Sequence, residues 1–182
     1  ADSYQESIQY PSLNVRGLKS GWVEKEVRTI IPSFALAEID VRLVKETDPN
    51  RLIRLIKEHI QKQGYHITKK DPSDEERMKY GRLITFKSKI SYTAFRTPID
   101  SPIGDWLSSA IRNGFEMEPI IKRTSGGSVP ISPFVNTLDV PAVTVPTVNP
   151  DNNQHSPNEN IRVGNLIESV RTHLAILAQP YK

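Results

Sequence analysis

Cysteine is absent from this sequence of 182 residues. Its absence excludes disulfides, thiolate metal sites and cysteine nucleophiles, so any bound metal must be held by histidines and carboxylates. The absence is compatible with the cytoplasm and with the periplasm, because neither compartment requires disulfides.

Long apolar runs and blocks of one charge are also missing. No stretch of about 18 apolar residues is present to cross a bilayer, and no signal peptide is visible in the N-terminal segment ADSYQESIQY, which has no basic region followed by an apolar core. The 24 basic and 21 acidic residues are interspersed, without a basic stripe that carries aromatic residues. We therefore expect neither a membrane nor a nucleic acid as a partner.

Several catalytic signatures are missing as well. The sequence contains no GxSxG, no HExxH, no Walker loop and no GxGxxG. These absences exclude a recognisable serine nucleophile, a zinc site built on one helix and the common nucleotide-binding loops.

What is present indicates a globular α+β chain, since 37% of the residues are hydrophobic and 25% are charged. Apolar residues alternate from Val27 to Val44, which predicts a half-buried strand. Asp48 and Pro49 then predict the start of a helix that ends at Gly64. Further strands are expected at SLNVRGL, at residues 65–68 and at residues 83–92, with a solvated connection over residues 69–79. Together they predict a small sheet covered by few helices.

A change of pattern occurs at Arg96 to Pro102, where two prolines interrupt strand and helix periodicity, and we expect a domain boundary there. A helix capped by Ser101 should follow and end at Gly114. A glycine turn at residues 124–128, a short strand at residues 142–145, a polar loop at residues 149–159 and a last helix complete the chain. This half resembles the edge of a larger α/β domain more than a complete fold.

His155 is the one credible metal ligand. It lies in a polar loop after an expected core strand, where ligand sites of α/β domains gather. The alternative is an exposed loop histidine without a role. A catalytic zinc needs about three protein ligands, so the isolated chain is not expected to be a competent metalloenzyme.

Two further places could bind substrate. In the turn Ser125-Gly126-Gly127-Ser128, paired glycines let backbone N–H groups approach an anion. The alternative, which the residues alone favour, is an ordinary tight turn. Arg42 could grip a substrate carboxylate with its guanidinium fork, or it could face solvent. Thr29 lies an odd number of residues before Arg42, so both share a face only if the strand breaks near Pro32.

The order of the segments resembles the C-terminal half of the co-catalytic zinc exopeptidases that include aminoacylase, carnosinase and carboxypeptidase G. The resemblance covers about residues 11–177 and rests on these segments in this order: PSLNVRGLKSG, RTIIPSFALAEIDVRLV, DP before a helix, RTSGGSVPI and NQHSPNEN.

The resemblance implies a fold of two parts. Residues 1–95 would be a lid, or dimerisation, domain of βαββαβ (ferredoxin-like) type that need not be complete at its N-terminus. Residues 96–182 would be the returning segment of the α/β catalytic domain. A homodimer formed through the lid would follow.

The resemblance also implies roles for single residues. His155 would be the last ligand of a two-zinc site whose other ligands lie in the N-terminal half of such proteins. Arg42 would bind the carboxylate end of the substrate, Thr29 would line the site, and Gly127 and Ser128 would contact substrate. One departure is Ser125, which stands where relatives commonly carry an acidic residue.

These implications predict a zinc-dependent hydrolase of peptides or N-acyl amino acids in its intact form, in which zinc activates water. The 182-residue chain alone, without most metal ligands, is expected to be inactive. The alternative is a non-enzymatic α+β module for dimerisation or binding, whose function would not depend on His155, Arg42 or Ser128.

Overall fold

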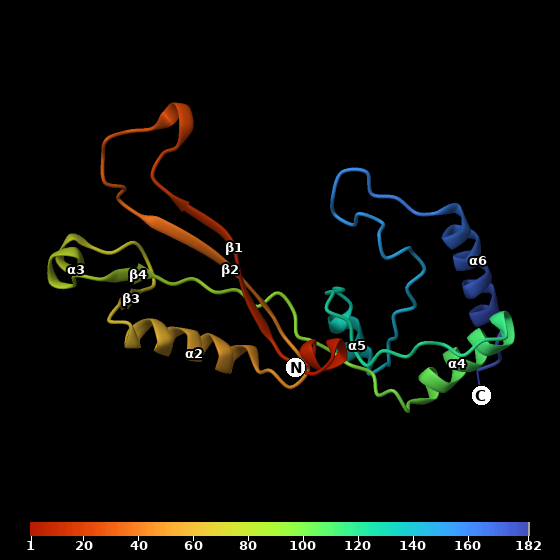
Figure 1. Cartoon of the computed structure of the whole chain (residues 1–182). Coiled ribbons are helices and arrows are strands. Elements are labelled where there is room, and N and C mark those ends of the chain that lie inside the picture. The colour runs from red at the N-terminus through yellow and green to blue at the C-terminus, as the bar shows by residue number, and fades with distance from the viewer. Residues whose placement is uncertain (182) are drawn as a thin grey trace. The chain divides into compact units, whose positions relative to one another are not determined.

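The computed structural model describes residues 1–181, which divide into two units (Figure 1). Unit 1 comprises residues 1–95, and unit 2 begins at Arg96, beside the proline-containing segment. The elements of unit 1 are α1 (Tyr4–Ser7), β1 (Ser12–Ser20), the short 3-10 helix η1 (Glu24–Glu26), β2 (Ala35–Arg42), α2 (Pro49–Lys62), β3 (His66–Thr68), α3 (Asp74–Lys79) and β4 (Leu83–Thr85). Those of unit 2 are α4 (Pro102–Phe115), α5 (Ser132–Leu138) and α6 (Val163–Ala178).

The predicted α+β class is confirmed, with small sheets and six α-helices in the described part of the chain. None of the helices within residues 1–181 combines the length and the apolar character needed to cross a bilayer.

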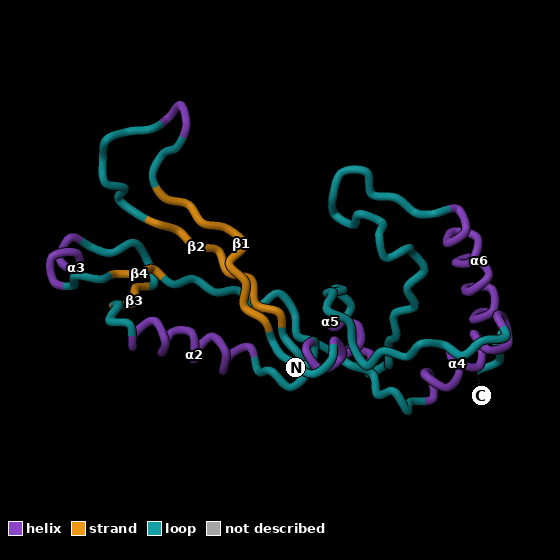
Figure 2. The backbone as a smooth tube through the Cα atoms, in the orientation of Figure 1, coloured by secondary structure: helices purple, strands orange, loops and turns teal. Residues whose placement is uncertain are grey.

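β1 and β2 form an antiparallel hairpin in which Ser12 faces Arg42 and Ser20 faces Ala35 (Figure 2). The register shifts between Val15 and Gly17. The predicted strand was too long at its N-terminal end, because residues 27–34 belong to the connection between β1 and β2.

The expected burial of one face of β2 is wrong for the chain as described. Ile39 is 47% exposed, and most of the strand is exposed with it. The hairpin has only two strands, so no further layer of the described chain covers either face. An alternating pattern identifies the face that is suited to burial, but burial itself requires a partner.

α2 confirms the predicted helix at both ends. The Asp48 carboxylate accepts a hydrogen bond from the Asn50 N–H at 2.9 Å, and Pro49 lies in the first turn. Gly64, with φ of +84°, lies just beyond the last turn. The half-buried stripe consists of Leu52, Ile53, Ile56 and Ile60.

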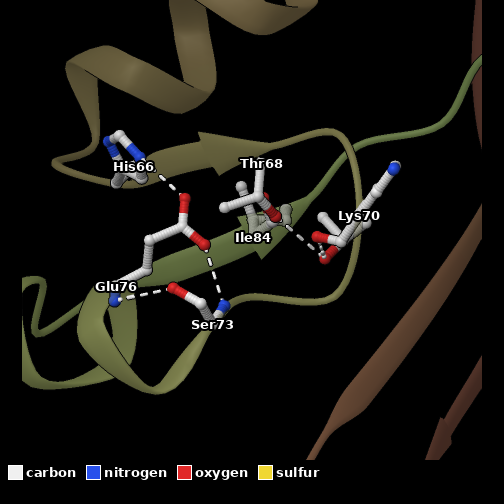
Figure 3. A network of polar contacts seen from close by, with 7 residues as sticks. His66, Thr68, Lys70, Ser73, Glu76 and Ile84 are labelled. Atoms are coloured by element: carbon white, nitrogen blue, oxygen red, sulfur yellow. Dashed lines mark hydrogen bonds and ion pairs between the residues drawn. The ribbon is translucent and has the colours of Figure 1, made fainter.

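β3 and β4 form a short parallel pair, in which His66 faces Leu83. The stretch between them was predicted to be a solvated connection, but it contains α3. The Ser73 hydroxyl accepts a hydrogen bond from the Glu76 N–H at 3.2 Å, and the Glu76 carboxylate accepts one from the Ser73 N–H at 2.9 Å (Figure 3). This capping box is readable as S-x-x-E, so the helix could have been predicted.

The other oxygen of the same carboxylate ties α3 to β3. Glu76 Oε1 lies 3.9 Å from His66 Nε2 (Figure 3), and the His66 ring stacks on the Tyr80 ring with 3.7 Å between centroids. The Thr68 and Thr85 hydroxyls meet at 3.0 Å across β3 and β4. These contacts hold α3 against a two-stranded sheet that would be marginal by itself.

The single small sheet predicted for this half is not formed by residues 1–181. The strands make two separate pairs, β1 with β2 and β3 with β4. Alternation and turn residues predicted where strands occur, but pairing depends on contacts between distant segments, which a local pattern does not encode.

In unit 2, α4 and α6 pack closely, and both occur where helices were predicted. The predicted end of α4 at Gly114 is wrong, because the helix continues through Gly114 to Phe115 and its C-cap is Glu116. A Cβ on Gly114 would lie 2.7 Å from the Ala175 Cβ, so the glycine permits the close approach. The Trp106 indole N–H donates to the Gln179 carbonyl at 2.9 Å. Ala110, on α4, is the one buried apolar residue of the described chain. Ser101 takes the predicted N-cap position of α4, but its hydroxyl makes no capping hydrogen bond.

The strand predicted at residues 142–145 is not formed in the described structure, and α5 was not predicted. The Thr97 hydroxyl donates to the Ala142 carbonyl at 2.7 Å and accepts from the Ala142 N–H at 3.1 Å. These two hydrogen bonds pair the backbone groups of Ala142 alone, whereas a strand needs a ladder of backbone hydrogen bonds along several residues. The described part of unit 2 therefore contains three helices and no strand, whereas a helix, a strand and a second helix were expected.

Candidate functional site

His155 lies in the connection between α5 and α6, and its side chain is exposed. Its backbone φ of +63° is in the left-handed region, as are those of Asn153 (+59°) and Asn158 (+64°). Asparagine and histidine both adopt this region more readily than most other non-glycine residues. The loop therefore turns sharply on both sides of an exposed imidazole.

The described residues do not make a metal site by themselves. Within residues 1–181, no three His, Asp or Glu side chains gather closely enough to hold an ion. A catalytic zinc normally has about three protein ligands. His155 is thus a single candidate ligand, and this chain alone does not fit the zinc site that the resemblance implies.

Arg42 is the last residue of β2. Its guanidinium Nε lies 2.6 Å from Asp40 Oδ2, and 51% of its side chain is exposed. The carboxylate of Asp40 orients the guanidinium, while the exposure leaves the side chain accessible to an anionic ligand.

Thr29 lies in the connection between β1 and β2, not in a strand. The argument from strand parity therefore does not apply to it. Eight residues of strand, roughly 26 Å, separate this connection from Arg42 at the far end of β2. Near Thr29, the Arg28 guanidinium lies over the Trp22 ring at 5.1 Å.

Gly127 and Ser128 belong to an exposed bend that precedes α5. A Cβ built on Gly127 meets nothing within 4 Å, and its φ is not in the left-handed region. The packing of the described chain therefore does not require glycine at this position.

The predicted site residues fall in both units. Thr29 and Arg42 belong to unit 1, whereas Gly127, Ser128 and His155 belong to unit 2. Sequence reasoning missed the polar side chains that hold the His155 loop, namely Asn149, Asp151 and Arg162. The abundance of Asn and Asp in residues 149–160 was the available signal, because these side chains cap loop backbones.

Residues 1–68 match the peptidase dimerisation domain of the M20 family. The chain is 23% identical to a Cys-Gly metallodipeptidase of Saccharomyces cerevisiae, over 93% of its own length. It is 26% identical to human Beta-Ala-His dipeptidase, over 94% of its length. The chain is related to the M20 metallopeptidases. The family resemblance expected from the ordered segments is therefore confirmed.

The M20 likeness extends to solved structures. An M20 family metallo-carboxypeptidase from Sulfolobus solfataricus matches 94% of the chain with a TM-score of 0.69 and 26% identity. Human carnosine dipeptidase 1 matches 97% with a TM-score of 0.71 and, at 23% identity, supports the fold alone. The chain spans about a third of the length of these M20 relatives, 33% and 32% for the two dipeptidases and 36% for each structure.

Proposed function

We propose that this chain is the part of an M20 metallopeptidase that carries the lid domain and the following segment of the catalytic domain. The intact protein then hydrolyses an amide bond of a peptide or an N-acyl amino acid in a metal-dependent reaction. The observation that carries the proposal is the M20 likeness over more than nine-tenths of the chain, which includes proteins named as dipeptidases and as a carboxypeptidase.

The order of elements supports the domain assignment. The order β1, β2, α2, β3 supplies the last four elements of a βαββαβ lid, which supports residues 1–95 as a lid that lacks its first strand and helix. Residues 96–182 are then the returning catalytic segment, whose helices α4 and α6 form the edge of an α/β domain.

Within this proposal, His155 is one metal ligand, Arg42 binds the substrate carboxylate, and Gly127 and Ser128 line the substrate site. Thr29 lies beyond the opposite end of β2 from Arg42, so it does not contact the same end of the substrate from the same chain. The exposed imidazole and guanidinium support these roles, because both groups are accessible to a ligand. The remaining metal ligands belong to chain outside these 182 residues.

The test uses the intact protein that carries this chain, assayed against dipeptides and N-acyl amino acids. A chelator should abolish hydrolysis and zinc should restore it, while His155→Ala should lower the metal content and should reduce kcat/KM at least a hundredfold. His173→Ala is the matched control, because His173 is an exposed histidine of the same unit, on α6, whose ring contacts the Ser169 carbonyl. Hydrolysis that survives His155→Ala unchanged would refute the role of this residue.

We also propose that the intact protein forms a homodimer through unit 1. In the described chain, β1 and β2 pair only with each other, so each strand has an open edge that can add another strand. The large apolar side chains exposed on these two strands are Leu13, Val15, Leu18, Leu36 and Ile39.

The dimer is tested by analytical ultracentrifugation of the intact protein. Leu18→Lys places a charge on this hairpin, where Leu18 is 78% exposed, and should weaken the dimer at least tenfold. Met78→Lys, at an 83% exposed position on α3, should leave it unchanged. A monomeric parent protein, or equal effects of the two changes, would contradict the proposal.

A non-enzymatic module is the second candidate, and the same open hairpin supports it. The two functions differ in what they require of the loops. If the protein is only a dimerisation or binding module, substitution of His155, Arg42 or Ser128 leaves its activity in the cell intact while Leu18→Lys impairs it.

A further inference from the structure

The loop that carries His155 is closed at its base by a buried amide. Asn149 is 1% exposed, and its side-chain oxygen accepts a hydrogen bond from the backbone N–H of Arg162 at 3.0 Å, 13 positions along the chain. Its side-chain N–H₂ donates to the Asp151 carboxylate at 2.8 Å. One side chain therefore joins both ends of the loop.

An exposed ion pair between Asp151 and Arg162 also joins the two ends of the loop. Asp151 accepts from Asn149 with one oxygen and forms an ion pair with the Arg162 guanidinium through the other. Arg162 is also the N-cap residue of α6. The base of the loop is thus attached to the first turn of a long helix.

Hydrogen bonds inside the loop fix its backbone. The Asn152 side-chain oxygen accepts from the Gln154 N–H at 3.2 Å, and its carbonyl accepts from the Asn160 N–H at 2.9 Å. The Asn153 amide group donates to the Pro157 carbonyl at 2.8 Å. His155, between these anchors, has its left-handed φ of +63°. A residue stays in such a conformation when the surrounding contacts over-determine it.

We propose that Asn149, Asp151 and Arg162 form a clasp that closes the loop of residues 149–162 and holds His155 in its exposed, left-handed conformation at the tip. The three are positioning residues. Their effect on the activity rests on the proposed function, in which His155 is a metal ligand.

The physical reason is pre-organisation. A metal-binding side chain on an open loop loses conformational entropy when it binds the metal. On a closed loop, that entropy has already been lost when the protein folds. The side chains of Asp151 and Arg162 are each 63% exposed, so the solvent weakens their ion pair. Buried Asn149 hydrogen-bonds to both ends of the loop, so its removal should loosen the loop more than removal of the ion pair.

The test measures amide hydrogen exchange of the intact protein by mass spectrometry, together with kcat and KM. Asn149→Ala should raise the exchange rate of residues 152–162 at least tenfold and lower kcat with little change in KM. Arg162→Ala should do the same to a smaller extent, and Arg162→Lys, which keeps the charge, should restore most of the protection. Arg112→Ala is the matched control, since it breaks another exposed ion pair of unit 2, with Glu118 at 2.8 Å, away from this loop.

Unchanged exchange in both Asn149→Ala and Arg162→Ala, or an equal rise in Arg112→Ala, overturns the clasp. Increased exchange without any loss of kcat, in a protein that His155→Ala inactivates, overturns its positioning role. If His155→Ala leaves the activity intact, the proposed function fails instead, and the exchange rates still decide whether the clasp holds the loop.

Discussion

Two arginines of the β1–β2 hairpin have similar surroundings and different expected roles. Arg42 lies 2.6 Å from Asp40, and Arg16 lies 3.2 Å from Glu38, with 51% and 65% of their side chains exposed. Each guanidinium thus pairs with a different carboxylate of the hairpin, and more than half of each arginine side chain is exposed. Neither the ion pairs nor the exposed fractions single out Arg42. It is singled out by its position in the segment VRLV, which resembles the M20 family.

The pair gives a matched test of substrate binding. Arg42→Ala in the intact protein should raise KM for substrates with a free carboxylate by roughly 10- to 100-fold, because a hydrogen bond to a charged group contributes about 1.5–3 kcal/mol. Arg16→Ala should leave KM within about twofold. Steady-state kinetics measures both, and equal effects would show that Arg42 has no specific role.

Asp151 should respond to pH in a defined direction. The hydrogen bond from Asn149 lowers the pKa of Asp151 from its ordinary value of 3.8, and Arg162 lowers it further, against an opposing effect of burial. Because the folded pKa lies below the unfolded one, the carboxylate stabilises the closed loop above pH 3.8 and loses this effect as the pH falls through the folded pKa.

An NMR titration of the Asp151 carboxyl carbon measures this directly. We expect a midpoint below 3.8 in the native protein and a higher one in Asn149→Ala. A native midpoint at or above the ordinary value would contradict the contacts described for the clasp.

At the scale of elements, the helices and strands differ in how far local sequence determined them. α2 was predicted at both ends, because Asp48, Pro49 and Gly64 act within one turn of it. α3 was missed although its Ser73–Glu76 capping box is equally local. The strands of unit 1 were predicted in the right places but not with the right lengths or as two separate pairs, and the strand predicted at residues 142–145 is not formed in the described structure, since a ladder depends on residues far along the chain.

The contact between α4 and α6 provides a prediction about packing. Gly114→Ala gains about 1 kcal/mol of helix propensity, but its Cβ would lie 2.7 Å from the Ala175 Cβ. Overpacking costs about 1–3 kcal/mol, so we expect a net loss of up to about 2 kcal/mol in the free energy of unfolding. Urea denaturation of the intact protein measures the change.

The double change Gly114→Ala with Ala175→Gly should restore the stability, because it removes the clash and the two propensity terms cancel. Gly164→Ala is the control within α6, where a Cβ meets nothing within 4 Å. A Gly114→Ala protein as stable as the Gly164→Ala protein would show that the two helices separate easily.

At the scale of the whole molecule, α6 has an apolar stripe without a cover in the described chain. Val163, Val170 and Leu177 are 72%, 63% and 83% exposed. Since the chain spans about a third of its relatives, we expect chain outside these 182 residues to cover the stripe in the intact protein.

Hydrogen exchange of a dilute monomer of the 182-residue chain tests this expectation. Residues 103–177 should exchange faster than the elements of unit 1, and the same residues should be protected in the intact protein. Equal protection of both units in the dilute monomer would contradict it.

The sequence by itself determined the resemblance to the M20 metallopeptidases, the α+β class, three long helices and the loop that carries His155. The resemblance depends on the order of segments along the chain, which is read directly from the sequence. The helices and the loop depend on caps, prolines, glycines and periodicity, which act over a few residues. The tertiary structure alone decided that the strands form two separate pairs, that Gly114 lies against Ala175, and that Asn149 and Arg162 close the histidine loop. Such contacts join residues distant in sequence, and their free energy depends on a geometry that exists only after the chain has folded.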